Sequence, residues 1–402
     1  MFTIKPVLSS LLRSRTGPLL LLLQIVLSVA IVANAGFIIQ ERLALMQRSS
    51  GVAEQSVLSF SVYNFGEKVN LPQQLKRDLE ILRNIPGIKA ATSTNMLPLS
   101  GSGWSDRFVD GPDPETAKST PGFAWYLGGE QMVDTLGVNV IEGRNFRADE
   151  LNHSTTDSGM KALMSAPLAK EVFGEESAVG QIMYQGSDNQ IEIIGVVETL
   201  QGAWVDSDQF DYSVIQNIEL NESRNNQFMV RADRRDIPAL EETIKQALRA
   251  ENPDRVIRNF NTLRELKDMS YAFHAVMAGM LSIMIILLLV ITSLGLSGMV
   301  MFNIQRRTKQ IGTRRALGAR KRDIVGMFLV ENWLICFSGG LLGGLLAMEL
   351  GSQLMTLFSL PMMGWQWPAM TVSGLLVITT VAVLLPARKA ALISPAIATR
   401  TV

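Results

Sequence analysis

The chain has 402 residues, of which 47% are hydrophobic, and its formal net charge is zero. The charges are distributed unevenly along the chain, because residues 40–271 hold 23 basic and 34 acidic residues, whereas the remainder holds 14 basic and 3 acidic. Long uncharged segments with a local basic excess exclude an ordinary soluble protein, and the single cysteine, Cys336, excludes an intramolecular disulfide.

The first forty residues predict a membrane anchor. Residues 1–16 combine an apolar stripe with three basic residues, which predicts a short interfacial helix on the cytoplasmic face. The next 25 residues, Thr16 to Gln40, carry no charge, and about 20 apolar residues suffice to span a bilayer. A signal peptide is the alternative, but the apolar run exceeds a typical signal core. We therefore expect an uncleaved first span over residues 17–40 that leads outward.

Residues 41–271 predict a large α+β domain outside the membrane. Two strand–helix–strand patterns occur near its ends, at about residues 55–95 and 222–268, which predicts one split subdomain closed by distant segments. The middle, about residues 96–221, is rich in Gly, Pro, Asp and Ser and predicts an inserted β-rich lobe. The expected strands are Val57–Tyr63, Ile88–Ser93, Phe228–Arg231 and Val256–Phe260, and the expected helices are Leu71–Arg83 and Ile237–Arg249.

A second span is expected over residues 272–304. The 37 residues from Met269 to Gln305 contain no Asp, Glu, Lys or Arg. As a helix at ~1.5 Å per residue they would measure ~55 Å, which exceeds the ~30 Å hydrocarbon core. We therefore expect this helix to project from the bilayer as a stalk.

Residues 305–323 form a strongly basic turn between two spans. Such a turn belongs on the cytoplasmic side, and its apolar residues offer a contact for a cytoplasmic partner. The stretch Ile311–Ala319 alternates apolar and basic residues and predicts a short helix that ends at Gly318 in a left-handed conformation, with Ile311 and Leu317 as apolar anchors. The alternative is that the charges only fix the topology. The eight basic residues are Arg306, Arg307, Lys309, Arg314, Arg315, Arg320, Lys321 and Arg322.

The remaining residues predict two further spans, so that both termini lie inside. A third span is expected over residues 324–357, a short outer loop over 358–369, a fourth span over 370–386 that ends at Pro386, and a cytoplasmic tail over 387–402. Two overlapping small-xxx-small patterns in the third span predict close helix contacts. Their residues are Gly339, Gly340, Gly343 and Gly344.

Several stretches resemble one family, the MacB/FtsX-like permease subunits of ABC transporters, which have the type VII exporter fold. The most specific is the basic turn, RTKQIGTRRALGARKRDI at Arg307–Ile324. The tail PARKAALISPAIA at Pro386–Ala398 is similar to the family's closing segment. In the outer domain, LGVNVIEGRNF at Leu136–Phe146 and the stretch Val172–Val197 resemble the MacB-type periplasmic core. The family often has acids where Arg306 and Gln310 stand here.

The resemblance implies four transmembrane helices and a large α+β periplasmic domain, with a porter-like split subdomain and an inserted lobe. It also implies a non-catalytic permease in the bacterial inner membrane that couples to an ATPase. No G-x-x-x-x-G-K-[ST] motif is present, so we expect a separate ATPase subunit to carry ATP and Mg. The implied coupling residues are Arg307, Thr308, Ile311, Gly312, Arg315, Leu317, Gly318 and Ala319, and the implied tail motif is Pro386, Ala387 and Arg388.

Further partners are implied by the same resemblance. They are a second permease, identical or paralogous, membrane lipid, and for the MacB subgroup a periplasmic adaptor and an outer-membrane channel. Related architectures serve lipoprotein release and the regulation of cell-wall hydrolases or sensors, and these alternatives stay open. We expect no cofactor or metal to bind this chain, because no metal-ligand cluster, nucleophile elbow or phosphate loop is found in the sequence. We expect no nucleic acid either, because eight basic residues beside a membrane are explained by orientation and by contact with anionic lipid.

Overall fold

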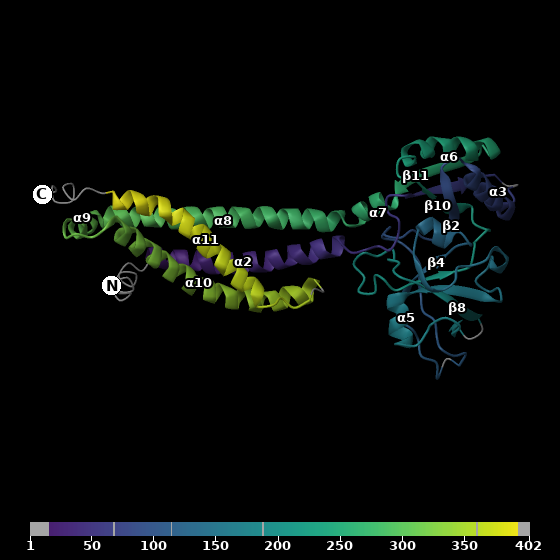
Figure 1. Ribbon diagram of the computed structural model, residues 1–402, viewed down its shortest axis with the longest axis horizontal. Coiled ribbons are helices and arrows are strands. Elements are labelled where there is room, and N and C mark those ends of the chain that lie inside the picture. The colour runs from purple at the N-terminus through teal and green to yellow at the C-terminus, as the bar shows by residue number, and fades with distance from the viewer. Residues whose placement is uncertain (1–15, 67–68, 114, 187–188, 359–360, 393–402) are drawn as a thin grey trace. The chain divides into compact units, whose positions relative to one another are not determined.

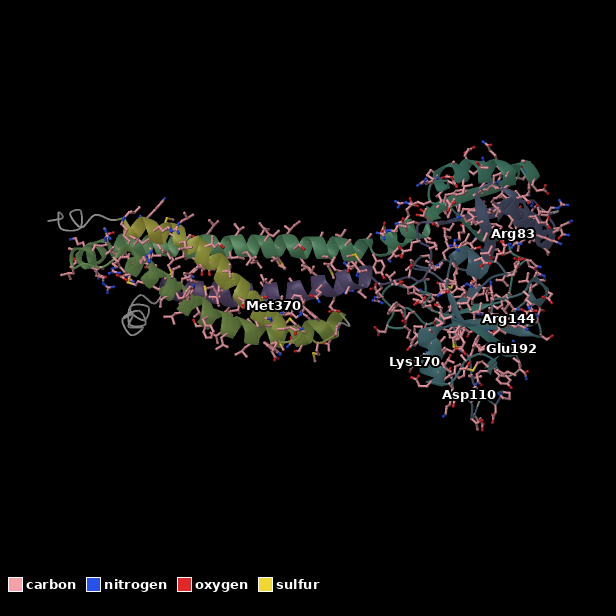
Figure 2. All side chains as sticks on the ribbon, in the orientation of Figure 1. Arg83, Asp110, Arg144, Lys170, Glu192 and Met370 are labelled. Carbon is pink, nitrogen blue, oxygen red and sulfur yellow. The ribbon has the colours of Figure 1, made fainter. Side chains whose placement is uncertain are left out.

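The computed structural model describes residues 16–66, 69–113, 115–186, 189–358 and 361–392 (Figure 1). The predicted interfacial helix over residues 1–16, apart from Thr16, and the tail beyond residue 392 lie outside the described residues. The chain divides into two compact units, a membrane unit of residues 1–46 with 273–402, and an outer unit of residues 47–272. Figure 2 shows nitrogen and oxygen atoms gathered over the outer unit and around the basic turn, and mainly carbon along the long helices.

Among the described residues of the membrane unit, four helices are long and apolar enough to cross a membrane. The prediction of four spans is therefore confirmed. The second span begins one residue after a helix of the outer unit, α7 (Leu263–Ser270), with Tyr271 between them. The four helices are α2 (Thr16–Met46), α8 (Ala272–Arg306), α10 (Lys321–Phe358) and α11 (Gln366–Ala391).

The glycines of α10 let it approach two neighbouring helices. A Cβ atom at Gly343 would lie 2.7 Å from the carbonyl oxygen of Val26 in α2, and one at Gly339 would meet Ile25 at 2.8 Å. On the adjacent face, a Cβ atom at Gly340 would lie 2.8 Å from Val372 of α11. The two overlapping patterns therefore serve two different helices, with Gly339 and Gly343 against α2 and Gly340 against α11.

The helix of the fourth span does not stop at Pro386, because α11 continues through Pro386 to Ala391. Proline has no N–H to donate to the carbonyl four residues before it, here that of Ala382. The Oγ of Ser297 in α8 donates to this carbonyl at 3.0 Å. A hydrogen bond from a neighbouring span thus replaces the missing backbone bond, as apolar surroundings demand.

The ends of the outer unit's sequence combine in one four-stranded antiparallel sheet of order β11-β1-β10-β2, which is the ferredoxin-like arrangement of two βαβ units. The predicted split subdomain is therefore confirmed. Its core includes the stacked rings of Phe60 and Phe228, 5.6 Å apart. The elements are β1 (Val57–Asn64), α3 (Leu71–Asn84), β2 (Ile88–Thr94), β10 (Asn225–Ala232), α6 (Ile237–Glu251) and β11 (Arg255–Thr262).

An ion pair lies fully buried inside this subdomain. The Arg255 Nη1 atom, at the start of β11, lies 2.8 Å from Oδ1 of Asp78 in α3, and both side chains are 0% exposed. Burial raises the pKa of the Asp78 carboxyl, against the opposing effect of Arg255. The pair joins the first helix of the subdomain to its last strand.

The middle of the outer unit forms a separate mixed sheet of order β3-β4-β9-β6-β8-β5, with β7 paired to β8. Trp125 is buried there and donates from Nε1 to Oε1 of Gln216 at 2.6 Å. The elements are β3 (Ser105–Asp106), β4 (Phe123–Leu127), α4 (Met132–Leu136), β5 (Val140–Gly143), η1 (Ala148–Glu150), β6 (Met160–Ser165), α5 (Ala166–Phe173), β7 (Ile182–Gln185), β8 (Asn189–Val197) and β9 (Ser213–Gln216).

A charged cluster lies within this lobe, between β5 and β6. Glu150 accepts hydrogen bonds from Arg144 at 2.6 Å and from Lys161 at 2.8 Å. The hydrogen bond from Arg144 is the largest effect that lowers the pKa of Glu150, and it holds that pKa well below its usual range. Arg144 follows β5 and Glu192 lies on its neighbour β8, and both are labelled in Figure 2.

Candidate functional site

The basic turn contains one short helix, α9 (Thr308–Ala316), between α8 and α10. It ends at Gly318, whose φ of +97° is the left-handed conformation that glycine adopts without strain. The amide of Ala319 donates to the carbonyl of Arg314 at 3.0 Å, and that of Gly318 to the carbonyl of Arg315 at 3.2 Å. This pair of bonds is a Schellman motif, so the predicted left-handed end at Gly318 is confirmed. The helix begins three residues earlier than expected.

Ile311 was expected on the surface of the turn, but its side chain is buried in the helix bundle. Its side chain is 1% exposed and packs with Ile324 and Phe328 of α10 and Ala387 and Ala390 of α11. The expectation that Ile311 is an anchor for a partner is wrong for this reason, since no surface of the side chain is available. Ile311 instead fastens α9 to the bundle, and the adjacent Gly312 is also buried.

The start of α9 is tied to both flanking spans. The Nη1 atom of Arg307 lies 3.3 Å from Oε2 of Glu331 in α10, and the Glu331 side chain is only 7% exposed. Thr308 donates from Oγ1 to the carbonyl of Ile304 in α8 at 2.8 Å. Arg307 and Thr308 are therefore parts of the joint between α8, α9 and α10. The sequence shows Glu331 as an acid within an apolar span, but its pairing with Arg307 was not foreseen.

The far end of α9 is the exposed part of the turn. Leu317 is 82% exposed, the highest value among the exposed large hydrophobic side chains described. Around it, Arg315 and Ala319 are half-buried and Gly318 is exposed. The loop ends where Oδ2 of Asp323 accepts from the amide of Arg320 at 2.9 Å, which caps the start of α10. An apolar side chain thus stands in a basic surrounding.

The tail motif lies beside α9. Pro386 and Ala387 are buried in α11, and Ala387 belongs to the same apolar cluster as Ile311. Arg388 is exposed. The structure therefore brings together residues that are 76 positions apart in the sequence, the core of α9 and the end of α11, and leaves Leu317 and Arg388 open.

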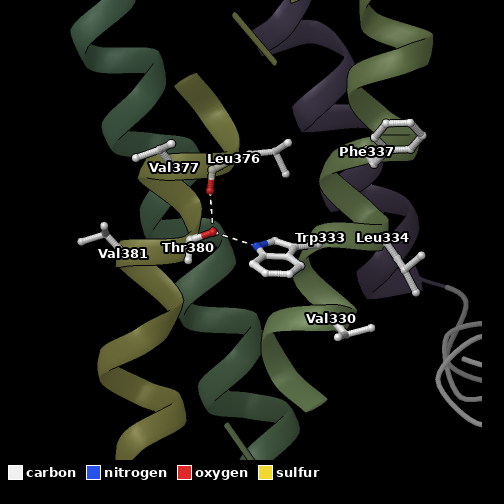
Figure 3. Close-up of a pocket in the computed structure, with 8 residues that line it drawn as sticks. All are labelled: Val330, Trp333, Leu334, Phe337, Leu376, Val377, Thr380 and Val381. Atoms are coloured by element: carbon white, nitrogen blue, oxygen red, sulfur yellow. Dashed lines mark hydrogen bonds between the residues drawn. The ribbon is translucent and has the colours of Figure 1, made fainter. Parts of the chain in front are cut away.

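A groove between α10 and α11 was not foreseen from the sequence (Figure 3). Its volume is about 700 Å³. Its polar atoms bond to each other, since Trp333 donates from Nε1 to Oγ1 of Thr380 at 2.8 Å and Thr380 donates to the carbonyl of Leu376 at 2.6 Å. The lining residues are Val330, Trp333, Leu334, Phe337, Leu376, Val377, Thr380 and Val381. Nowhere in the described part of the chain do three His, Cys, Asp or Glu residues form a group that could hold a metal ion.

Two curated relatives share most of this chain's length. "Macrolide export ATP-binding/permease protein MacB" of Vibrio parahaemolyticus is 25% identical over 281 residues, which are 66% of this chain and 41% of the relative. The protein of the same description from Mannheimia succiniciproducens is 24% identical over 313 residues, 76% of this chain and 46% of the relative. The chain therefore spans less than half the length of these relatives.

Two solved structures are similar to the chain. The periplasmic region of MacB from Actinobacillus actinomycetemcomitans is 17% identical, with a TM-score of 0.34, and the match covers 54% of this chain and 94% of that one. The extracellular domain of the noncanonic ABC-type transporter YknZ from Gram-positive bacteria is 12% identical, with a TM-score of 0.33, and the match covers 50% of this chain and 100% of that one.

Two family descriptions together cover nearly all of the chain. Residues 19–247 match the MacB-like periplasmic core domain, and residues 282–395 match the FtsX-like permease C-terminal domain. The first match alone includes more than half of the residues. The chain therefore belongs to the family of membrane permeases that combine a MacB-like periplasmic core domain with an FtsX-like permease C-terminal domain.

Proposed function

We propose that this chain is the permease subunit of an ABC exporter and that a separate cytoplasmic ATPase, which binds ATP and Mg, drives it through α9. The curated relatives are described as ATP-binding/permease proteins for macrolide export. The match of residues 282–395 to the FtsX-like permease C-terminal domain supports the permease role of this chain.

One contrast within α9 and its end carries this proposal. Leu317 is 82% exposed, whereas Ile311, six residues earlier, is 1% exposed inside the bundle. Leu317 would enter an apolar depression of the ATPase, with the surrounding arginines facing acidic residues. Because Ile311 and the Arg307–Glu331 pair hold α9 to the bundle, a displacement of α9 would move α8 and α10 with it.

The motion would then reach the outer domain along α8. This helix follows α7, the last helix of the outer unit, after one residue, Tyr271, so no long linker separates α7 from α8. Two permeases, identical or paralogous, would act with two ATPase subunits in the inner membrane. The outer domain would pass a periplasmic substrate to an adaptor and an outer-membrane channel.

The docking role of Leu317 is tested by Leu317→Asp. This substitution keeps all eight basic residues of the turn, so insertion should be normal, but it puts an unpaired carboxylate into the proposed apolar contact. We expect normal expression, loss of the ATPase on co-purification, and loss of export. Leu392→Asp is the matched control, because Leu392 is also exposed, at the end of α11, and gains the same charge outside α9. Wild-type ATPase recovery with Leu317→Asp would refute the docking site.

The proposed orientation places both termini in the cytoplasm and the outer unit in the periplasm. Single cysteines at Ser158 and Thr313, both exposed, test it in a Cys336→Ser background. An impermeant thiol reagent should label Ser158→Cys on intact spheroplasts and Thr313→Cys only after lysis. Labelling in the reverse order would overturn the topology.

A further inference from the structure

The groove between α10 and α11 continues as a trough along both helices. A second cavity of about 450 Å³ adjoins the first and shares Phe337 and Leu376 with it. The second cavity extends to Met348 on α10 and Trp365 at the start of α11. Both helices are candidate spans, so in a membrane the trough would lie at the depth of the hydrocarbon core.

The trough is suited to a ligand without hydrogen-bonding groups. In the larger cavity the side-chain polar groups are Trp333 and Thr380, and both are occupied by the chain Trp333–Thr380–Leu376 in Figure 3. A polar ligand would lose its hydration there and find no donor or acceptor in return. The lining therefore favours an alkyl chain.

A further transmembrane helix fits the larger cavity poorly. Close helix contact needs small residues, and no Gly, Ala or Ser is among the described residues that line this cavity, although Gly340, Gly344, Ala369 and Ser373 line the second one. What the larger cavity presents instead is large and exposed, since Phe337 is 64% and Val377 65% exposed. A flexible chain can fill the spaces between such side chains, whereas a rigid helix would rest on their tips.

One end of the trough is basic. Val377, Val381, Leu385 and Arg388 follow at spacings of four, four and three residues, so they form one stripe on α11. All four are exposed. Their 11-residue separation corresponds to ~16 Å along the helix, about half of the ~30 Å hydrocarbon core. Among the described residues no carboxylate pairs with Arg388, so its guanidinium is open to an anion from outside the chain.

We propose that this trough is a phospholipid site, in which one acyl chain lies between Trp333 and Val377 and the phosphate of an anionic headgroup binds Arg388. A basic residue at the end of an apolar groove between spans is the arrangement that selects anionic lipids. The site does not depend on the ATPase or on the orientation of the chain. Its failure and the failure of the proposed function can therefore be told apart.

Trp333 supplies the readout, since its indole lies in the groove. The full chain is reconstituted in phosphatidylcholine vesicles that contain either brominated phosphatidylglycerol or brominated phosphatidylcholine at equal mole fraction. Subtracting the signal of Trp333→Phe isolates the quenching of Trp333. We expect stronger quenching by the brominated phosphatidylglycerol. Arg388→Gln should reduce this preference about five-fold, the equivalent of about 1 kcal/mol for one basic residue at the surface, and Arg388→Lys should retain it.

A second pair of variants separates the groove from the lipid surface in general. Val377→Phe fills the groove without changing charge and should reduce quenching by both lipids. Ile286→Phe, on the exposed face of α8, is the matched control and should have no effect. Equal quenching by the two brominated lipids, or an unchanged preference with Arg388→Gln, would overturn the proposal. So would an absence of quenching by either lipid, because the groove would then be covered by protein, such as a second copy of this chain.

Discussion

Ile311 and Leu317 are predicted to have opposite roles, and alanine substitutions separate them. Ile311→Ala leaves a cavity at a buried position and should lower the free energy of unfolding by about 2–5 kcal/mol. The smaller change Ile311→Val should lower it by about 0.5–1.5 kcal/mol. Leu317→Ala removes a side chain that is 82% exposed, and its effect on stability should stay within about 0.5 kcal/mol. For a unit of this size, Ile311→Ala should lower the unfolding temperature by roughly 4–20 °C.

The chain carries its own reporter for this measurement. Cys336 is the one cysteine of the sequence, and it is buried in the same apolar cluster as Ile311. A dye that fluoresces on reaction with thiols therefore reports the opening of the membrane unit during heating, without an engineered label. ATPase binding is measured in parallel, below the unfolding temperature of each variant.

The expected result is a crossed pattern. Ile311→Ala should shift the thermal transition, with Ile311→Val between it and the wild type, whereas Leu317→Ala should leave the transition in place and weaken ATPase binding. The reasoning is refuted if Leu317→Ala shifts the transition as far as Ile311→Ala, because Leu317 would then be packed. It is equally refuted if Ile311→Ala causes no shift.

Three further predictions concern stability. Asp78→Ala should destabilise the outer unit by about 3–5 kcal/mol, because it leaves Arg255 charged and buried, whereas the double variant Asp78→Leu/Arg255→Met should recover most of the loss in thermal unfolding followed by tryptophan fluorescence. The pKa of Glu150 is lowered in the folded state, so its ionised carboxylate stabilises the fold above its ordinary pKa, and this stabilisation is lost as the pH falls. The unfolding temperature of the wild type should therefore drop between about pH 5 and pH 3. It should drop less steeply in the Glu150→Gln variant. Gly343→Val should lower the temperature at which Cys336 becomes reactive, since a Cβ atom there would meet α2 at 2.7 Å, whereas Gly298→Val should not, since no atom lies within 4 Å.

The features that could be predicted from sequence are those set by neighbouring residues. The apolar periodicity of residues 71–84 and 237–251 defines both helices of the ferredoxin-like subdomain. The left-handed end of α9 follows from Gly318 itself. The uncharged runs set the number of spans, because an unpaired charge is costly in hydrocarbon.

The features that could not be predicted depend on partners far along the chain. Pro386 lies inside a helix, and Ser297, on another span, bonds the carbonyl of Ala382 that the proline leaves open. Ile311 is buried because α11 returns to cover it, and nothing in the basic turn reveals that contact. The Arg307–Glu331 pair joins residues 24 positions apart on two helices whose relative placement is a tertiary property.

The strand order of the outer subdomain sets the timing of its folding. Strand β1 pairs on one side with β10 and on the other with β11, both of which lie beyond the entire inserted lobe. During translocation β1 therefore emerges long before either pairing partner. The backbone N–H and C=O groups on both of its edges stay unpaired while some 160 residues follow. Such non-local pairing is slow and leaves unpaired strand edges open to aggregation. Maturation of this permease should thus depend on protection of an early strand, most of all when synthesis outpaces export of the lobe.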